Sequence, residues 1–130
     1  VTTLFERVGK DVLRATLVDF YERVFADVMI GYLFAGKDKE RLIQKEYELT
    51  AQLLGGEVAY TGRTMHEAHK DAHILGGHFD RRLHILRETL AAHDILPAAQ
   101  AIWLEHNLML RDQVTALGPG ECDAPVARKK

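Results

Sequence analysis

The sequence predicts an all-α protein folded as a single domain. Apolar residues recur at helical spacing along most of the chain, and no segment shows the strict alternation of apolar and polar residues that is typical of a strand. Glycines, prolines and N-capping residues separate the segments of helical length. The 130 residues suit one domain, which at this length buries about two thirds of its unfolded surface.

Two helices are expected at the start of the chain. A short one lies around residues 2–8, and a longer one covers residues 12–27, "VLRATLVDFYERVFAD". The longer segment carries one apolar stripe, made of Leu13, Leu17, Phe20, Tyr21, Val24 and Phe25. Spacing by three and four residues places these side chains on one helix face, so we expect that face to be buried.

The third helix is predicted from its ends. Residues 28–36, "VMIGYLFAG", form a short apolar segment that stops at Gly36. Asp38 is a suitable N-cap, because its carboxylate accepts hydrogen bonds from backbone N–H groups of a first turn. The helix is expected to run to about Leu54, and the Gly-Gly pair at 55–56 ends it.

A loop and two further helices follow. Residues 57–63, "EVAYTGR", have no helical pattern and are expected to form the loop. A short helix is predicted near residues 64–72, and a longer one at residues 78–93. The Gly-Gly pair at 76–77 is expected to separate these two helices.

The last helix is predicted to begin at Pro97, which suits a first turn, and to continue to about Leu117. The globular domain is therefore expected to span residues 1–117. Residues 118–130, "GPGECDAPVARKK", have the composition of a disordered tail. The single cysteine, Cys122, lies in this tail, so neither a disulfide framework nor a CxxC metal site is expected.

Composition argues against several classes of partner. The net charge is −2, which gives no basic surface for nucleic acid or for an anionic membrane. No run of about 18 apolar residues occurs, and the first residues, "VTTLFERVGK", lack the apolar core of a signal peptide. A cytoplasmic protein without nucleic-acid or membrane partners is therefore expected.

Two charged residues interrupt the apolar stripe of the third helix. The stripe consists of Leu42, Leu49 and Leu53. Lys45 and Glu46 stand three and four residues after Leu42, and charges on a buried face are costly unless they are paired or bound to something. Either these two residues line a binding site, or the helix is rotated and a different face is buried, namely Ile43, Tyr47 and Thr50.

Histidines concentrate in one part of the chain. Residues 63–86 hold five of the seven histidines, which are His66, His69, His73, His78 and His84. The first three share one helix face, but the zinc-protease pattern HExxH is absent, and a hemerythrin-like di-iron site needs histidines upstream of His66. A single histidine on a short helix is also how a protein holds a haem iron. The remaining histidines are expected to be solvated, namely His78, His84, His93 and His106.

Six short motifs together resemble one family. In order they are "DFYERVFAD", "YLFAG", "LLGG", "YTGR", "M-x-E-A-H-K" and "HFDR". Their order and spacing resemble the truncated hemoglobins, most closely group I, over about residues 2–116. The resemblance implies a truncated globin fold, a two-over-two helical sandwich around one haem b.

The resemblance also assigns site residues. It implies that His69 is the proximal ligand of the haem iron and that the Tyr21 hydroxyl lies over the iron. Lys45 and Glu46 would face the distal side. The pocket residues it implies are Phe20, Phe34, Leu42, Leu49, Met65, Ile74 and Phe79. For such a ligand we expect the second ring nitrogen of His69 to bond a backbone carbonyl one turn earlier, which fixes the ring and raises its basicity.

The sequence departs from group I at several positions. Many members have glutamine where Glu46 stands, and an ionised carboxylate cannot donate to a bound gas. We therefore expect Glu46 to be protonated, paired with Lys45 or Tyr21, or turned to solvent. Lys45 is a candidate sixth iron ligand as a neutral amine. The early Gly-Gly of the family is Gly9-Lys10 here, and His106 is a candidate for covalent attachment to a haem vinyl group.

The resemblance implies reversible binding of a diatomic gas, with O2, NO or CO as ligands. Oxidation of NO to nitrate is a further activity of this kind, and it needs an external reductase. A different hypothesis is a six-coordinate haem protein for electron transfer or redox sensing, with Lys45 as distal ligand. A third hypothesis is a helical protein with a non-haem metal site.

Overall fold

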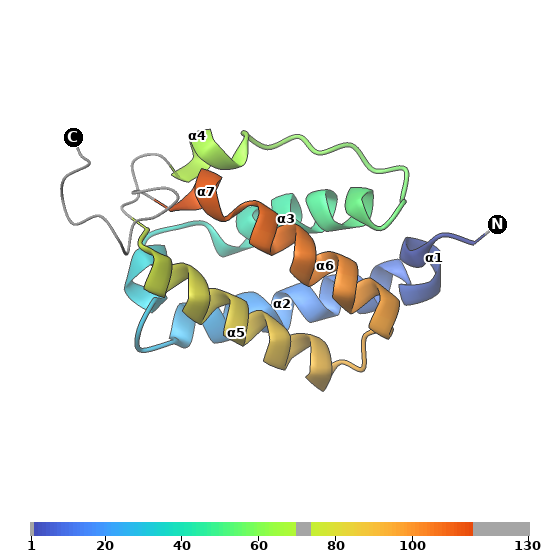
Figure 1. Ribbon diagram of the computed structural model, residues 1–130, viewed down its shortest axis with the longest axis horizontal. Helices are drawn as coiled ribbons and strands as arrows, with labels where there is room; N and C mark the ends of the chain where they lie inside the picture. The colour runs from blue at the N-terminus through green and yellow to red at the C-terminus, as the bar shows by residue number, and fades with distance from the viewer. Residues whose placement is uncertain (1, 70–73, 116–130) are drawn as a thin grey trace.

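The computed structural model describes residues 2–69 and 74–115, and every regular element within these ranges is a helix (Figure 1). In chain order the elements are α1 (Leu4–Val8), α2 (Lys10–Ala26), the 3-10 helix η1 (Gly31–Phe34), α3 (Lys39–Leu53), α4 (Met65–His69), α5 (Gly76–Ala92), α6 (Pro97–Met109) and α7 (Arg111–Val114). The predicted all-α class is confirmed.

The four long helices form two pairs that cross each other. Helix α2 contacts α3 and α5, and α6 contacts α5 and α3. Figure 1 shows α5 and α6 in front of α2 and α3, and the short α4 packs against α7. This is the two-over-two sandwich that the sequence predicted.

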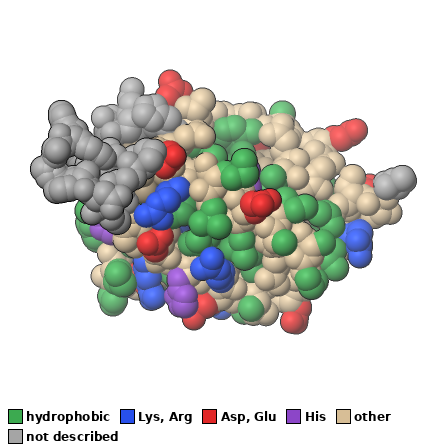
Figure 2. Space-filling view, viewed as in Figure 1, with side chains coloured by type: hydrophobic (Ala, Val, Ile, Leu, Met, Phe, Trp, Pro, Cys, Tyr) green, Lys and Arg blue, Asp and Glu red, His purple; other side chains and the backbone are tan. Residues whose placement is uncertain are grey.

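The core lies between these pairs and centres on α2. The largest side chains that are fully buried are Trp103, Phe20, Leu13, Leu17, Ile30, Ile43, Leu86 and Leu90. Burying an aliphatic or aromatic side chain of this size contributes about 1.5–3 kcal/mol each. Hydrophobic side chains gather at the middle of the face in Figure 2. On α6, Ile102, Leu108 and Met109 are exposed.

Two helix starts show why these segments are helical. The Thr3 side chain accepts a hydrogen bond from the Glu6 backbone N–H, and the Glu6 carboxylate accepts one from the Thr3 N–H, which makes a capping box for α1. The Asp38 carboxylate accepts a hydrogen bond of 3.1 Å from the Arg41 backbone N–H. The predicted N-cap of α3 is therefore confirmed.

Three boundaries differ from the prediction. Helix α2 begins at Lys10, because Gly9 adopts a positive φ of 91° that redirects the chain from α1 into α2. Helix α5 begins at Gly76, since the His78 ring accepts a hydrogen bond from the Leu75 N–H at 3.1 Å and caps a turn that starts earlier. The last helix is interrupted at Leu110, so α6 and α7 replace the expected single helix.

Some sequence predictions fall outside the described residues. These are the end of the helix expected near 64–72 and the tail expected at 118–130. Within the described residues, no helix is both long and apolar enough to cross a membrane.

Candidate functional site

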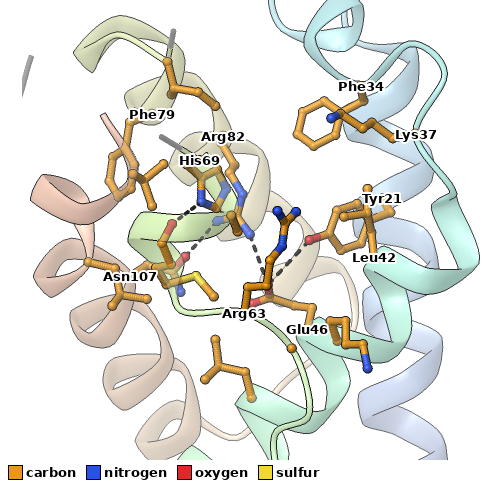
Figure 3. Close-up of a pocket in the computed structure, with 18 of the residues that line it drawn as sticks. Tyr21, Phe34, Lys37, Leu42, Glu46, Arg63, His69, Phe79, Arg82 and Asn107 are labelled. Atoms are coloured by element: carbon orange, nitrogen blue, oxygen red, sulfur yellow. Dashed lines mark hydrogen bonds and ion pairs between the residues drawn. The ribbon is translucent and has the colours of Figure 1, made fainter. Parts of the chain in front are cut away.

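A cavity of about 280 Å³ opens between the two helix pairs and beside α4. Its walls are mostly apolar, and they include six of the predicted pocket residues, namely Phe34, Leu42, Leu49, Met65, Ile74 and Phe79. Figure 3 shows His69 and Tyr21 entering this cavity from opposite sides. The volume is near the lower end of the range for small-molecule pockets, about 300–1,000 Å³.

His69, the last residue of α4, offers one free ring nitrogen to the cavity. Its Nδ1 lies 2.7 Å from the Met65 carbonyl oxygen, the bond expected for this ring. A carbonyl only accepts, so the proton is on Nδ1 and the lone pair is on Nε2. Burial lowers the pKa of His69, although the bond to Met65 opposes that shift. The neutral ring with a free Nε2 is the form that binds a metal.

Tyr21 faces His69 from α2 and is almost completely buried, with 5 % of its surface exposed. Its ring meets the ring of Phe20 edge-on at 5.1 Å and that of Phe34 at 6.5 Å, which fixes its direction. Burial, together with the nearby Glu46 carboxylate, raises the pKa of Tyr21 well above its usual value. The hydroxyl therefore keeps its proton and acts as a hydrogen-bond donor.

Glu46 is held by two partners inside the cavity. Its Oε1 accepts from the Tyr21 hydroxyl at 3.5 Å and from Arg82 Nη2 at 3.5 Å (Figure 3). Pairing with Tyr21 was one of the expected arrangements. Arg82, on α5, was missed by the sequence analysis. The signal was present, because Arg82 stands between the buried Phe79 and Leu83, where a charge needs a partner.

Lys45 points away from Glu46. Its Nζ donates a hydrogen bond to the Thr61 hydroxyl and lies 3.9 Å from Glu48 Oε1. The lysine lines the cavity, but its amine is engaged with the loop before α4. Of the alternatives considered for Glu46, pairing with Lys45 is not the one found, because the Lys45 amine lies near Glu48 instead.

Glu48 is a second functional group that the sequence analysis missed. It is 7 % exposed, and it accepts hydrogen bonds from Gln44, at 3.0 Å, and from the backbone and hydroxyl of Thr61, at 2.9 and 2.7 Å. These bonds lower the pKa of Glu48 to about 2, chiefly through Gln44 and Thr61. The spacing of residues in α3 gave no sign of this cluster, because Thr61 belongs to a separate loop.

Both interpretations of α3 are partly correct. The helix buries Ile43 and Thr50, as the rotated alternative required, while Tyr47 is half-buried. The face that carries Lys45 and Glu46 lines the cavity.

Phe20, the seventh predicted pocket residue, is not among the residues that line the cavity. It is fully buried in the core, and its ring meets the Tyr21 ring edge-on at 5.1 Å. The Arg82 guanidinium lies over its ring, 4.9 Å from the centroid. Phe20 therefore supports the cavity wall from behind.

The other histidines have varied surroundings. His84 is exposed, as predicted. His93 is instead bonded to Asp19 at 2.8 Å, and His78 to the Tyr32 hydroxyl at 3.1 Å. His106 is half-buried and lines the cavity.

A metal site of several histidines receives no support from the structure. No three His, Cys, Asp or Glu side chains converge on a metal-sized site within residues 2–69 and 74–115. The side chain of His66 and the whole of His73 lie outside the described part of the chain.

Exposed cations stand at the edge of the cavity. They are Lys37, Arg41 and Arg63, and the half-buried Tyr60 lies beside them in the lining. An apolar interior with a cationic edge suits a flat apolar molecule that carries carboxylates at one side.

Comparisons with known proteins agree with this geometry. Residues 3–116 match the bacterial-like globin family. Over 89 residues the chain is 32% identical to a group 1 truncated hemoglobin of Tetrahymena pyriformis, covering 68% of this chain and 74% of that protein. The chain belongs to the truncated hemoglobins. It is also 41% identical over 97 residues to a group 1 truncated hemoglobin of Synechocystis sp., covering 69% of this chain and 77% of the other.

The fold of this truncated hemoglobin matches solved structures of the same family. Superposition on the crystal structure of truncated hemoglobin from Tetrahymena pyriformis in its Fe(III) form gives a TM-score of 0.76 at 26% identity. The match covers 88% of this chain and 98% of that one. Membership of the hemoglobins implies a haem cofactor whose iron binds a diatomic ligand.

The residues of the cavity fit a haem. His69 offers an unprotonated nitrogen, the walls are apolar, and cations at the edge suit the two haem carboxylates. Trp103 also lines the cavity, and its indole Nε1 is a buried donor with no partner among the described residues. A buried donor without a hydrogen-bond partner is destabilising. This agrees with a cavity that holds a bound molecule.

Proposed function

We propose that this truncated hemoglobin binds O2 or NO reversibly at a haem iron held by His69, with Tyr21 as the donor to the bound gas. The observation that supports this most is the placement of the two residues on opposite sides of one apolar cavity. A planar haem between them would present one face of its iron to His69 and the other to Tyr21.

His69 supports the proposal through its hydrogen bond. The Met65 carbonyl fixes both the ring direction and the tautomer, so Nε2 is the nitrogen available to the iron. The haem, when bound, supplies the iron that takes the gas. His69 would hold that iron through Nε2, and Tyr21 would serve as a donor from the other side of the cavity.

Tyr21 supports the proposal because its hydroxyl can donate a hydrogen bond to a bound gas that carries partial negative charge. A haem bound in this cavity would supply the iron that takes O2, and the gas would carry a partial negative charge when bound. A buried donor to such a group stabilises it by about 1–3 kcal/mol. The Tyr21 hydroxyl also lies 3.5 Å from Glu46 Oε1. The net stabilisation of the bound gas is therefore smaller, because the hydroxyl gives up this interaction when it donates to the gas.

The alternative of a six-coordinate haem with Lys45 as the sixth ligand receives less support. Its amine would have to leave Thr61 and the nearby Glu48 carboxylate and lose its proton. Both changes oppose ligation, so we infer an open sixth position. We also infer that the haem is of the b type, held without a covalent bond. The half-buried His106 is the residue to replace if the haem resists extraction.

The ferrous absorption spectrum of the haem-loaded protein tests the proposal. We expect a five-coordinate spectrum from about pH 6 to 10. His69→Ala should lose that spectrum and regain it on addition of free imidazole, while His84→Ala, which changes an exposed histidine, should behave as the parent protein does. An unchanged spectrum in the His69 variant would refute its role. Low-spin bands that grow with pH and vanish in Lys45→Ala would establish the alternative.

A further inference from the structure

Arg82 is a half-buried cation that lines the cavity. Its side chain is 21 % exposed, and it reaches from α5 into the cavity lining. Its Nη1 donates to Asn107 Oδ1 at 2.7 Å, and the guanidinium lies over the Phe20 ring. These contacts with α6 and α2 fix the group in one place, so its charge is a permanent part of the cavity.

The charge of Arg82 requires a counter-charge. An arginine stays protonated at all ordinary pH values, and an unpaired charge at this depth is strongly destabilising. Among the described residues, the carboxylate that pairs with Arg82 is Glu46, at 3.5 Å. Burial is the largest influence on the pKa of Arg82 and would lower it, but Glu46 and Tyr21 together more than offset that effect, so the pKa is raised. The two residues therefore stabilise each other as ions.

The same oxygen of Glu46 also faces Tyr21. Oε1 lies 3.5 Å from Arg82 Nη2 and 3.5 Å from the Tyr21 hydroxyl, so the carboxylate bridges the arginine and the tyrosine (Figure 3). A tyrosine has one proton to donate. That proton goes either to Glu46 or to a bound gas, and ligand binding has to compete with the carboxylate.

We propose that Arg82 is a positioning residue of the gas-binding site: it holds Glu46 as a fixed anion, and Glu46 in turn sets how strongly the Tyr21 hydroxyl is available to the ligand. This rests on the proposed function above. Arg82 acts through Glu46, so the effect of changing Glu46 depends on whether Arg82 is present.

A double-mutant cycle tests this dependence. The four proteins are the parent chain, Arg82→Met, Glu46→Gln and the double variant, all loaded with haem. For each we would measure the O2 dissociation rate and the C–O stretching frequency of the ferrous CO complex, which reports the charge and the donors around the ligand. If Arg82 acts through Glu46, the fold-change in the double variant should differ by fivefold or more from the product of the single fold-changes.

Two controls separate this role from a structural one. Arg87→Met removes the same charge from an exposed position on α5 and should leave both readouts unchanged. Arg82→Lys keeps the charge and should lie closer to the parent protein than Arg82→Met does. If Arg82→Met takes up no haem, the same cycle with Arg82→Gln decides, because glutamine removes the charge but keeps a polar group that can donate to Asn107.

The outcomes are distinct. The inference would be overturned if the fold-change of the double variant equals the product of the two single fold-changes within a factor of two and the shifts of the C–O frequency add. The proposed function would remain in place. Failure of the parent protein to form a CO complex would overturn the proposed function itself. A fivefold or larger departure from the product of the single fold-changes, with unchanged readouts in Arg87→Met, supports Arg82 as the positioning residue.

Discussion

At the scale of single residues, the site is built from groups whose protonation is fixed by their neighbours. The Met65 carbonyl places the proton of His69 on Nδ1. Burial and Glu46 keep the proton on the Tyr21 hydroxyl. The cavity therefore has one lone pair on the His69 side and one donor on the Tyr21 side, which is the asymmetry that a gas-binding haem needs.

Replacing Tyr21 tests the donor. Tyr21→Phe removes one hydroxyl and keeps the ring, so the packing against Phe20 and Phe34 should survive. We expect O2 to dissociate several-fold faster, because the hydrogen bond from Tyr21 to the bound gas is lost. The increase should be smaller than the loss of a full hydrogen bond would give, since the Tyr21 hydroxyl also interacts with Glu46 in the parent protein. Stopped-flow measurement of the dissociation rate gives the answer.

Tyr47→Phe is the matched control, since Tyr47 lies on α3 outside the cavity lining and packs against Phe5 and Arg14. Its dissociation rate should equal that of the parent protein. If Tyr21→Phe also leaves the rate unchanged, the hydroxyl does not reach the ligand.

At the scale of elements, a polar cluster attaches the loop before α4 to α3. Glu48 receives bonds from Gln44 on its own helix and from Thr61 in the loop, and Lys45 adds a further bond to Thr61. The loop leads directly to α4, which carries His69. Glu48 thus helps to place the predicted iron ligand relative to the helix on the other side of the cavity.

The cluster makes stability depend on pH. The folded pKa of Glu48, about 2, is below its usual value of 4.5, so its contribution is complete above about pH 4.5 and is lost as pH falls towards 2. We expect Glu48→Gln to lower the free energy of unfolding near pH 7 by about 1–3 kcal/mol. The loss relative to the parent protein should shrink near pH 3, because the parent has then lost much of the same contribution.

Urea denaturation at the two pH values measures both effects. Glu57→Gln changes an exposed carboxylate at the start of the same loop and should show neither. A constant difference between Glu48→Gln and the parent protein at the two pH values would show that the carboxylate is not held as an anion by these bonds.

At the scale of the whole molecule, the features that could be predicted from the sequence are those that depend on residues close together in the chain. The apolar stripe of α2 and the Asp38 cap depend on residues three or four positions apart, so they are visible in the sequence. The Arg82–Glu46 pair and the Glu48–Thr61 bonds join separate elements, and spacing does not show them. His69 and Tyr21 came from the family resemblance, and the structure places them across one cavity.

The cavity also predicts how haem changes the whole fold. It is bordered by α3, α4 and α5, so a bound haem would add contacts to all three helices. A ligand that binds the folded state alone stabilises it by about 4 kcal/mol at a thousand times its dissociation constant. The gain should be largest for α4, a five-residue helix that carries His69, the proposed iron ligand, and smallest for α2, whose face is already buried in the core.

Hydrogen exchange followed by mass spectrometry, with and without haem, measures this distribution. We expect peptides covering residues 57–69 to gain the most protection from exchange. Peptides from the middle of α2 should gain the least, as long as their exchange does not require unfolding of the whole protein. His69→Ala loaded with haem should lose the gain at residues 57–69 first, since the bond from the iron to α4 is gone. Equal protection along the chain, unaffected by this variant, would mean that haem stabilises the fold without attachment through His69.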